Sequence, residues 1–268
     1  MKKLTVIAVL SILICTACVN QNVPREGDTN SLEGLQQMGA RGTASTPKKN
    51  ASLIREEAVR ETALTVGAQA GLAYRAEQLN KVLNERGELL SRVFNFRAMM
   101  LPHNVLPPVL SEGRQSLNLA DNNTIRLADR VYKIESQARF VTGVPDWRDY
   151  LAMNFSPPER PNDTLLPKTH KERAVWKENI EIAWRDGFKQ AESIYLENLA
   201  RLKRDYNGMV LYRKLLAQGM VSAPYVAKTN LGVTGGGSDM RVNDQVLRIT
   251  ALPNLQPQSK NWQPVFTK

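Results

Sequence analysis

Apolar and aromatic side chains recur at helical spacing over residues 180–209, and this stripe constrains the fold more than any other feature. Its members are Ile180, Trp184, Phe188, Ala191, Tyr195, Leu199, Leu202, Tyr206 and Met209. Their mean spacing of about 3.6 residues is the period of an α-helix. Thr169 and Glu172 have the spacing of a capping box at a helix start. The sequence predicts a helix over about 170–206, with a break at Asn207 and Gly208, after which the helix could continue.

A second helix is predicted to begin near Asn50 or Ser52, either of which can cap its first turn. Apolar residues then follow at spacings of three and four, namely Leu64, Ala68, Leu72, Ala76, Leu79 and Leu83. Gly67 and Gly71 lie four positions apart, as in the G-x-x-x-G pattern of packed membrane helices. This stretch is too short and too polar to be a membrane helix. The two glycines therefore predict close packing against another element of the protein.

Between these helices the apolar period changes from helical to alternating. Leu117 and Leu119, then Ile125 and Leu127, flank the turn-forming residues 121–123, which predicts a hairpin that residues 131–134 could extend. The stretch 156–167 carries four prolines and is predicted to be a loop.

The C-terminal region reads as short strands and an extended tail. Over residues 231–251 we expect strands joined by turns at 235–237 and at 243–244, followed by an extended tail over 252–268, with Trp262 and Phe266 as docking points. Long helices packed with short antiparallel hairpins, without βαβ alternation, predict an α+β fold. We expect one such domain over residues 51–251.

The N-terminus has the organisation of a secretory leader. Two lysines at positions 2–3 precede an apolar run over 4–14, which is shorter than the roughly 20 residues that span a bilayer. Ala17 is the small residue that lipoprotein signal peptidase requires before a cysteine, whereas bulky Ile14 precedes Cys15. We expect a signal peptide over 1–17, cleavage between Ala17 and Cys18, and lipidation of Cys18. An ordinary signal peptide and an uncleaved leader are the alternatives.

Residues 18–50 are predicted to be a lipidated flexible tether. They contain no aromatic residue and are rich in small and polar residues, so they offer little apolar surface to offset the entropy of ordering. Val19 stands where an Asp would retain a lipoprotein in the inner membrane. In a Gram-negative source we therefore expect the outer membrane, with the domain on its periplasmic face.

The sequence offers no candidate catalytic, cofactor-binding or metal-ligating residues. The two histidines, His103 and His170, are far apart, and no third cysteine joins Cys15 and Cys18 in a metal site. The run GGGSD at 235–239 lacks the Gly-Lys-Ser/Thr ending of a phosphate loop. We expect neither an enzyme nor a small-molecule substrate, although a carboxylate hydrolase is not strictly excluded by the sequence.

The net charge of +10 suggests an acidic binding partner, such as lipid head groups, acidic protein surfaces or nucleic acid. The charge alone does not distinguish among these three. Five cations cluster late in the second helical region, namely Arg201, Lys203, Arg204, Arg213 and Lys214. Glu197 and Asp205 accompany them, and no recognition motif surrounds them. We therefore favour a solvated helix face over direct nucleic-acid contact.

Four long stretches carry a family resemblance. They are FNFRAMMLPHNVLPPVLSEGRQSLNLADNNTIRLADR (94–130), TGVPDWRDYLAMNFSPPERPNDTLLPK (142–168), ARLKRDYNGMVLYRKLLAQGMVSAPYV (200–226) and LGVTGGGSDMRVNDQVLRITALP (231–253). In this order they resemble the DotC family, the lipoproteins of Dot/Icm-type, or type IVB, secretion systems and of related conjugation systems. The likeness runs from about residue 50 to the C-terminal region.

The resemblance implies an outer-membrane lipoprotein within an envelope-spanning core complex. It also implies two partners, a DotD-like lipoprotein and a DotH-like core subunit whose placement in the outer membrane depends on both lipoproteins. The family's lipidated cysteine corresponds to Cys18, and the family has no catalytic residues to carry over. A periplasmic cell-wall-acting enzyme and a DNA-contacting conjugation protein remain the alternatives at this point.

Overall fold

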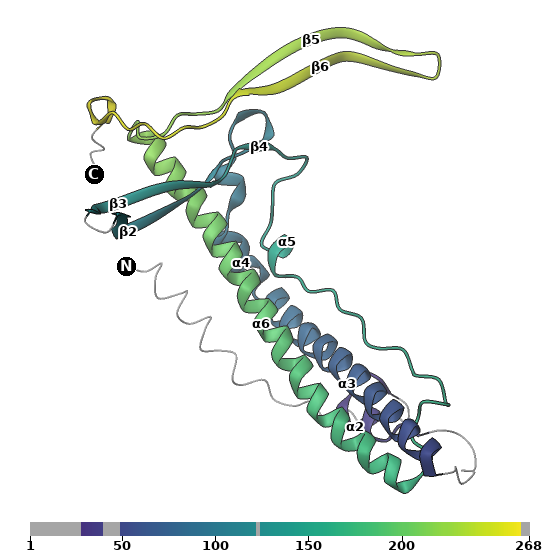
Figure 1. Ribbon diagram of the computed structural model, residues 1–268. Coiled ribbons are helices and arrows are strands. Elements are labelled where there is room, and N and C mark those ends of the chain that lie inside the picture. Colours follow the sequence, from purple (N-terminus) through teal and green to yellow (C-terminus); the bar gives the residue numbers. More distant parts are fainter. Residues whose placement is uncertain (1–27, 40–48, 122–123, 264–268) are drawn as a thin grey trace. The chain divides into compact units, whose positions relative to one another are not determined.

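The computed structural model describes residues 28–39, 49–121 and 124–263, with side chains throughout except at 49–52 and 118–121. In these ranges the fold is α+β, as predicted, with two long helices and three separate two-stranded antiparallel sheets (Figure 1). Among the described helices, none combines the length and the apolar character needed to cross a bilayer. The predicted leader, Ala17, Cys18 and Phe266 lie outside the described residues.

The two long helices are α3 (Lys49–Glu85) and α6 (His170–Ala217). The shorter helices are α2 (Leu32–Gln36), α4 (Gly87–Val93) and α5 (Arg148–Leu151), with 3₁₀ turns at Phe96–Met99, Pro102–Asn104 and Ser259–Asn261. The paired strands are β1 (Val105–Leu106) with β4 (Arg139–Phe140), β2 (Val109–Asp121) with β3 (Thr124–Ser136), and β5 (Tyr225–Gly236) with β6 (Asp239–Ala251).

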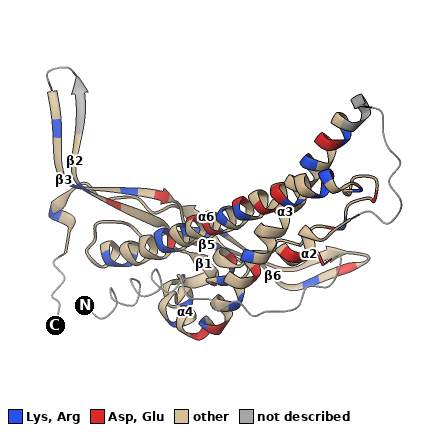
Figure 2. Cartoon of the chain, turned by 90° about the horizontal axis from the view of Figure 1, so that it is seen from below, with Lys and Arg blue, Asp and Glu red and all other residues tan. Residues whose placement is uncertain are grey.

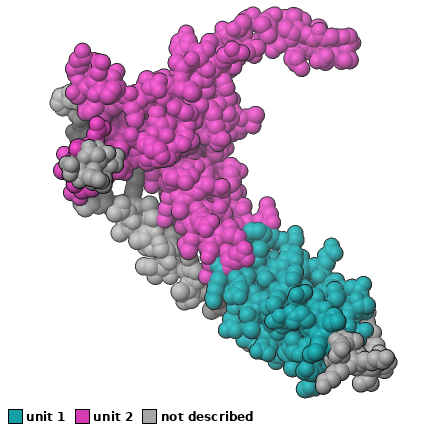
Figure 3. Space-filling view, viewed as in Figure 1, with its two compact units in different colours: residues 1–74, 155–189 teal, residues 75–154, 190–268 magenta. Residues whose placement is uncertain are grey.

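The described residues group into two compact units, where the sequence predicted one domain over 51–251. Unit 1 comes from residues 1–74 and 155–189, and unit 2 from residues 75–154 and 190–268 (Figure 3). Each long helix contributes its first part to unit 1 and its second part to unit 2.

The core of unit 1 is formed where α3 and α6 approach each other closely. Its buried residues are Leu35, Met38, Val59, Ala63, Val66, Ala70, Leu166, Trp176, Ile180 and Trp184. A Cβ added at Gly67 would lie 2.8 Å from the carbonyl oxygen of Ile180, and one at Gly71 would collide with the backbone of Trp184. The prediction that these glycines serve close packing is therefore confirmed.

Residues 28–39 differ from the flexible tether that was predicted over 18–50. Ser31 caps α2, accepting a hydrogen bond from the backbone N–H of Gly34 at 3.1 Å. Leu35 and Met38 are buried in the core of unit 1, and Trp176 Nε1 donates to the Leu35 carbonyl oxygen at 2.8 Å. The polar composition of the whole stretch concealed these two apolar residues, of which Leu35 lies in α2 and Met38 just after it.

The predicted start of α6 is confirmed. The backbone N–H of Glu172 donates to Thr169 Oγ1 at 3.2 Å, and the N–H of Thr169 donates to Glu172 Oε2 at 3.3 Å, which completes the capping box. The stripe that follows is buried at Ile180, Trp184, Ala191, Tyr195, Leu202 and Met209.

The predicted break in α6 is wrong, because the helix continues without interruption to Ala217. A Cβ at Gly208 would collide with the Val109 side chain and lie 2.8 Å from the Leu110 carbonyl oxygen. Gly208 therefore allows β2 to lie against α6 within unit 2. Next to it, Leu110 packs with Tyr212, Leu215 and Val221 in a second buried cluster.

Candidate functional site: two exposed β-hairpins

The β5–β6 hairpin is a long two-stranded ribbon in unit 2. Its pairing runs from Tyr225 opposite Ala251 to Gly236 opposite Asp239, and no third described strand pairs with it. The turn follows Gly236, close to the predicted turn at 235–237. The backbone of Gly235 has a φ of 145°, and a Cβ there would collide with the backbone of Asp239. Glycine is required at this position.

The second predicted turn, at Asn243 and Asp244, is wrong because both residues lie inside β6. The pairing register shifts here, between Gly232 opposite Asp244 and Val233 opposite Val242. Asn243 is the extra residue and has a φ of 58°, a conformation that Asn tolerates better than most residues. The signal interpreted as a turn is thus a β-bulge, which twists the ribbon.

Three apolar side chains, which we call the tip cluster, lie on one face at the end of this ribbon. Val233 lies opposite Val242, and Met240 lies opposite Gly235, which has no side chain to cover it. Residues two apart on a strand face the same side, so the three form one patch. Their exposed fractions are 64% for Val233, 71% for Met240 and 63% for Val242. This patch was not predicted, although apolar alternation on both sides of a glycine turn is its signal in the sequence.

The ribbon also leaves backbone groups unpaired on both outer edges, since no other described strand pairs with β5 or β6. Unpaired strand edges are templates for binding another strand. An isolated two-stranded hairpin is marginally stable in water. The length of the ribbon and its uncovered apolar patch therefore suit a surface that another protein covers.

The β2–β3 hairpin confirms the predicted strands and extends through residues 131–134 to Ser136. Asp121 pairs with Thr124, while the turn residues 122–123 between them lie outside the described ranges. Leu117 lies opposite Leu127, and their exposed fractions are 66% and 77%. This hairpin, too, ends in uncovered aliphatic side chains.

The cationic cluster on α6 makes contacts within unit 2. The Arg201 guanidinium lies 5.4 Å from the ring centre of Tyr150, Arg204 pairs with Asp205 at 3.0 Å, and Arg213 donates to the Ala98 carbonyl oxygen at 3.4 Å. Figure 2 shows basic and acidic residues interspersed along α3 and α6. This arrangement is typical of a solvated helix face.

Tyr150 belongs to an aromatic group in unit 2. Its ring stacks on Phe96 with centroids 5.7 Å apart, and its hydroxyl donates to Asp205 Oδ2 at 3.3 Å. Burial, followed by the charge of Asp205 and this hydrogen bond, raises the pKa of Tyr150 to about 12. The hydroxyl therefore stays protonated at neutral pH and acts as a hydrogen-bond donor.

The structure does not bring the two histidines together with other ligand residues. His103 is exposed in a 3₁₀ turn, and His170 is exposed at the start of α6. No group of three or more His, Cys, Asp or Glu side chains in the described ranges could hold a metal ion. The GGGSD run forms the β5–β6 turn rather than a loop before a helix.

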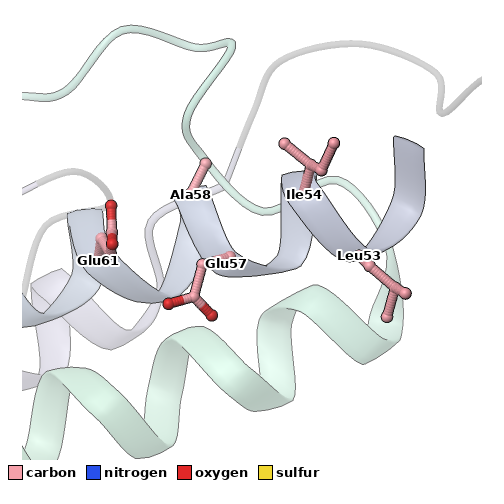
Figure 4. A pocket seen from close by; sticks show the side chains of 5 residues that line it. All are labelled: Leu53, Ile54, Glu57, Ala58 and Glu61. Carbon is pink, nitrogen blue, oxygen red and sulfur yellow. The ribbon is translucent and has the colours of Figure 1, made fainter. Parts of the chain in front are cut away.

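A shallow depression lies near the start of α3. It is lined by Leu53, Ile54, Glu57, Ala58 and Glu61, which project from successive turns of this one helix (Figure 4). Glu57 is paired with Arg60, and the hydrogen bond from that guanidinium lowers the pKa of Glu57 despite the opposing effect of desolvation. The depression thus lacks the convergent polar groups of a ligand site.

A family model, T4SS_TraI, described as "Type IV secretory system, conjugal DNA-protein transfer", matches residues 53–264. This span includes both long helices nearly in full and both hairpins. No curated protein matches the chain.

Proposed function

The chain belongs to the conjugal DNA–protein transfer family of type IV secretory systems, and from this premise we propose a specific role within such a system. The protein is a lipid-anchored structural subunit of the outer-membrane core complex of a type IVB secretion or conjugation system. The DotC resemblance over 94–130, 142–168, 200–226 and 231–253 supports the choice of this subunit. The observation that carries the structural role is the β5–β6 ribbon, whose tip cluster is exposed and whose outer edges pair with no other strand in the described ranges.

The anchor in this proposal is Cys18, acylated after cleavage behind Ala17. Each buried methylene contributes about 0.8 kcal/mol, so one acyl chain binds reversibly and additional chains make the attachment stable. The anchor confines the protein to the periplasmic face of the outer membrane and raises its effective concentration there. Partners that bind it are then held at the same membrane.

The ribbon is the partner surface in this proposal. A strand of a DotH-like or DotD-like partner adds to an outer edge of β5 or β6, where backbone groups give affinity. The tip cluster gives specificity by filling an apolar pocket of that partner, in the way that a few buried apolar residues dominate many interfaces.

The test is affinity purification of the tagged full-length protein from membranes of cells that carry the whole secretion system. Val233→Asp combined with Val242→Asp places two charges in the tip cluster without removing a buried side chain. We expect recovery of the DotH-like and DotD-like subunits to fall at least tenfold, because burial of an unpaired charge is costly.

Leu196→Asp is the matched control, since Leu196 is an aliphatic residue of α6 with an exposed fraction of 55%. Thermal unfolding of each variant verifies that the fold is intact. Undiminished recovery of both partners with the double variant would exclude the tip cluster as the docking surface.

A further inference from the structure

The β2–β3 hairpin has two chemically different faces. Ile125 and Leu127 alternate with Arg126 along β3, and Leu117 lies opposite Leu127 on β2. Since the side-chain period of a strand is two, the three aliphatic residues share one face and Arg126 lies on the other. The aliphatic residues have exposed fractions of 66% for Leu117, 54% for Ile125 and 77% for Leu127.

The opposite face is cationic. Arg114 lies directly opposite Arg130, and Arg126 is on the same side of β3 as Arg130. Like charges opposite each other destabilise a hairpin. Glu112 Oε1 lies 3.6 Å from Arg114 Nε and 3.7 Å from Arg130 Nε, so one carboxylate serves two guanidinium groups. Arg126 adds a third guanidinium to this face, so three positive charges face one carboxylate and two are left in excess, which points to an anionic partner.

The aliphatic face by itself is too small to form a stable protein interface. Five residues of each strand measure about 17 Å by about 10 Å, which gives roughly 170 Å² for this end of the hairpin. A stable protein interface buries about 800 Å² on each partner. A nucleic acid offers phosphates to the arginines but no extended apolar surface to Leu127.

A lipid bilayer offers both chemistries at one surface. We propose that the end of the β2–β3 hairpin binds the surface of an anionic phospholipid bilayer, with its aliphatic face on the acyl chains and its arginines on phosphates. A two-stranded ribbon is narrow, so the long arginine side chains can extend past its edges to reach the headgroups. Amphipathic segments of this composition bind in the plane of the interface.

One acidic residue limits this contact. Asp129 lies on the same side of β3 as Leu127, two residues further toward the base of the hairpin. Its charge is unfavourable in an apolar environment, so the contact with acyl chains ends before Asp129.

This inference relies on the proposed function only for the presence of a membrane beside the protein. An acyl anchor alone lets the protein rotate freely about the membrane normal and tilt away from it. A second contact through the hairpin would hold unit 2 against the bilayer in one orientation.

The test uses the full chain carrying Cys15→Ser and Cys18→Ser, which removes both native thiols. An environment-sensitive fluorophore is attached at Leu127→Cys, and quenching is measured with spin-labelled acyl chains in phosphatidylcholine vesicles containing about 0% or 30% phosphatidylglycerol. The matched control is a label at Ala128→Cys, the next residue, on the opposite face. We expect quenching at position 127, increased by phosphatidylglycerol, and little at 128.

Arg126→Gln and Arg130→Gln should each weaken vesicle binding about fivefold, the effect of about one arginine near an anionic surface. Equal quenching at positions 127 and 128 would overturn the proposal. Retention of a DNA duplex that depends on the arginines, without quenching at 127, would overturn it in favour of nucleic-acid binding. Because Cys18→Ser removes the cysteine that would be acylated, neither result depends on the proposed anchor.

Discussion

Arg55 and Glu172 form an ion pair in which Arg55 Nε donates a hydrogen bond to Glu172 Oε1 at 3.0 Å, although 117 positions separate them in the sequence. The same guanidinium donates to the carbonyl oxygens of Thr164 at 2.6 Å and Leu166 at 3.0 Å. One arginine of α3 therefore fixes both the end of the proline-rich loop and the first turn of α6 in unit 1.

Replacing Glu172 should make the stability of unit 1 depend less on pH. Burial acts to raise the pKa of Glu172, but hydrogen bonds from the Lys168 N–H and the Arg55 guanidinium outweigh it and lower the pKa below 4.5. A lowered pKa means that the ionised carboxylate stabilises the fold above about pH 4.5 and that this contribution is lost as the pH falls through the folded-state pKa.

Glu172→Gln keeps a side chain that can complete the capping box but removes the charge. We expect it to cost about 1–3 kcal/mol at pH 7 and progressively less below pH 4.5, measured by urea unfolding of both proteins across pH. Glu178→Gln, at an exposed position of α6, is the control and should change little at any pH. A cost for Glu172→Gln that does not shrink at low pH would contradict the role assigned to the charge.

Gly187→Ala should destabilise unit 1, because a Cβ at Gly187 would collide with the backbone of Ala68 and Leu72 on α3. Overpacking of this kind costs about 1–3 kcal/mol or more when backbone must move. Gly143→Ala is the matched control, since nothing lies within 4 Å of a Cβ added there. Thermal unfolding of the two variants should show a clear drop in melting temperature for Gly187→Ala alone.

Asn80→Asp should loosen the segment that precedes the proline-rich loop. Asn80 Nδ2 donates to the Met153 carbonyl oxygen at 2.7 Å, and Oδ1 accepts from the Met153 N–H at 3.1 Å. The aspartate keeps the acceptor and sets a carboxylate oxygen against the carbonyl, which we expect to cost about 1–3 kcal/mol. Asn84→Asp, on an exposed position of α3, should be close to neutral in the same denaturation measurement.

The long helices could be predicted from the sequence because their signals are local. The stripe over 180–209 and the Thr169–Glu172 box need no knowledge of what packs against them. The role of Gly208 could not be predicted, because only the position of β2 shows that its missing side chain makes room for Val109 and Leu110. The bulge at Asn243 was mistaken for a turn for a similar reason, since a left-handed residue serves both structures.

The candidate surfaces were predicted only as secondary structure. The sequence predicted strands over 231–251, but the tip cluster follows from the pairing of Val233 with Val242 and of Gly235 with Met240, which only the structure shows. The two faces of the β2–β3 hairpin likewise depend on register. A shift of one residue would exchange Leu127 with Arg126 and could not be excluded from composition alone.

Cys18→Ser should release the protein from the outer-membrane fraction, because the acyl chains are the main attachment in our proposal. Cys15→Ser is the matched control, since cleavage behind Ala17 removes residue 15 with the leader. Density-gradient fractionation should find the Cys15→Ser protein with the outer membrane and most of the Cys18→Ser protein elsewhere. Equal distribution of the two variants would show that the attachment does not depend on Cys18.

The central claim is that acyl chains on one cysteine hold this protein at a membrane as a structural subunit. Mass spectrometry of the natural N-terminal peptide, purified from cells that carry the secretion system, tests that claim most directly. We predict a peptide that begins at Cys18 and carries the added mass of a diacylglyceryl group and an N-acyl chain. A peptide that retains the leader, or that begins with an unmodified Cys18, would contradict the account.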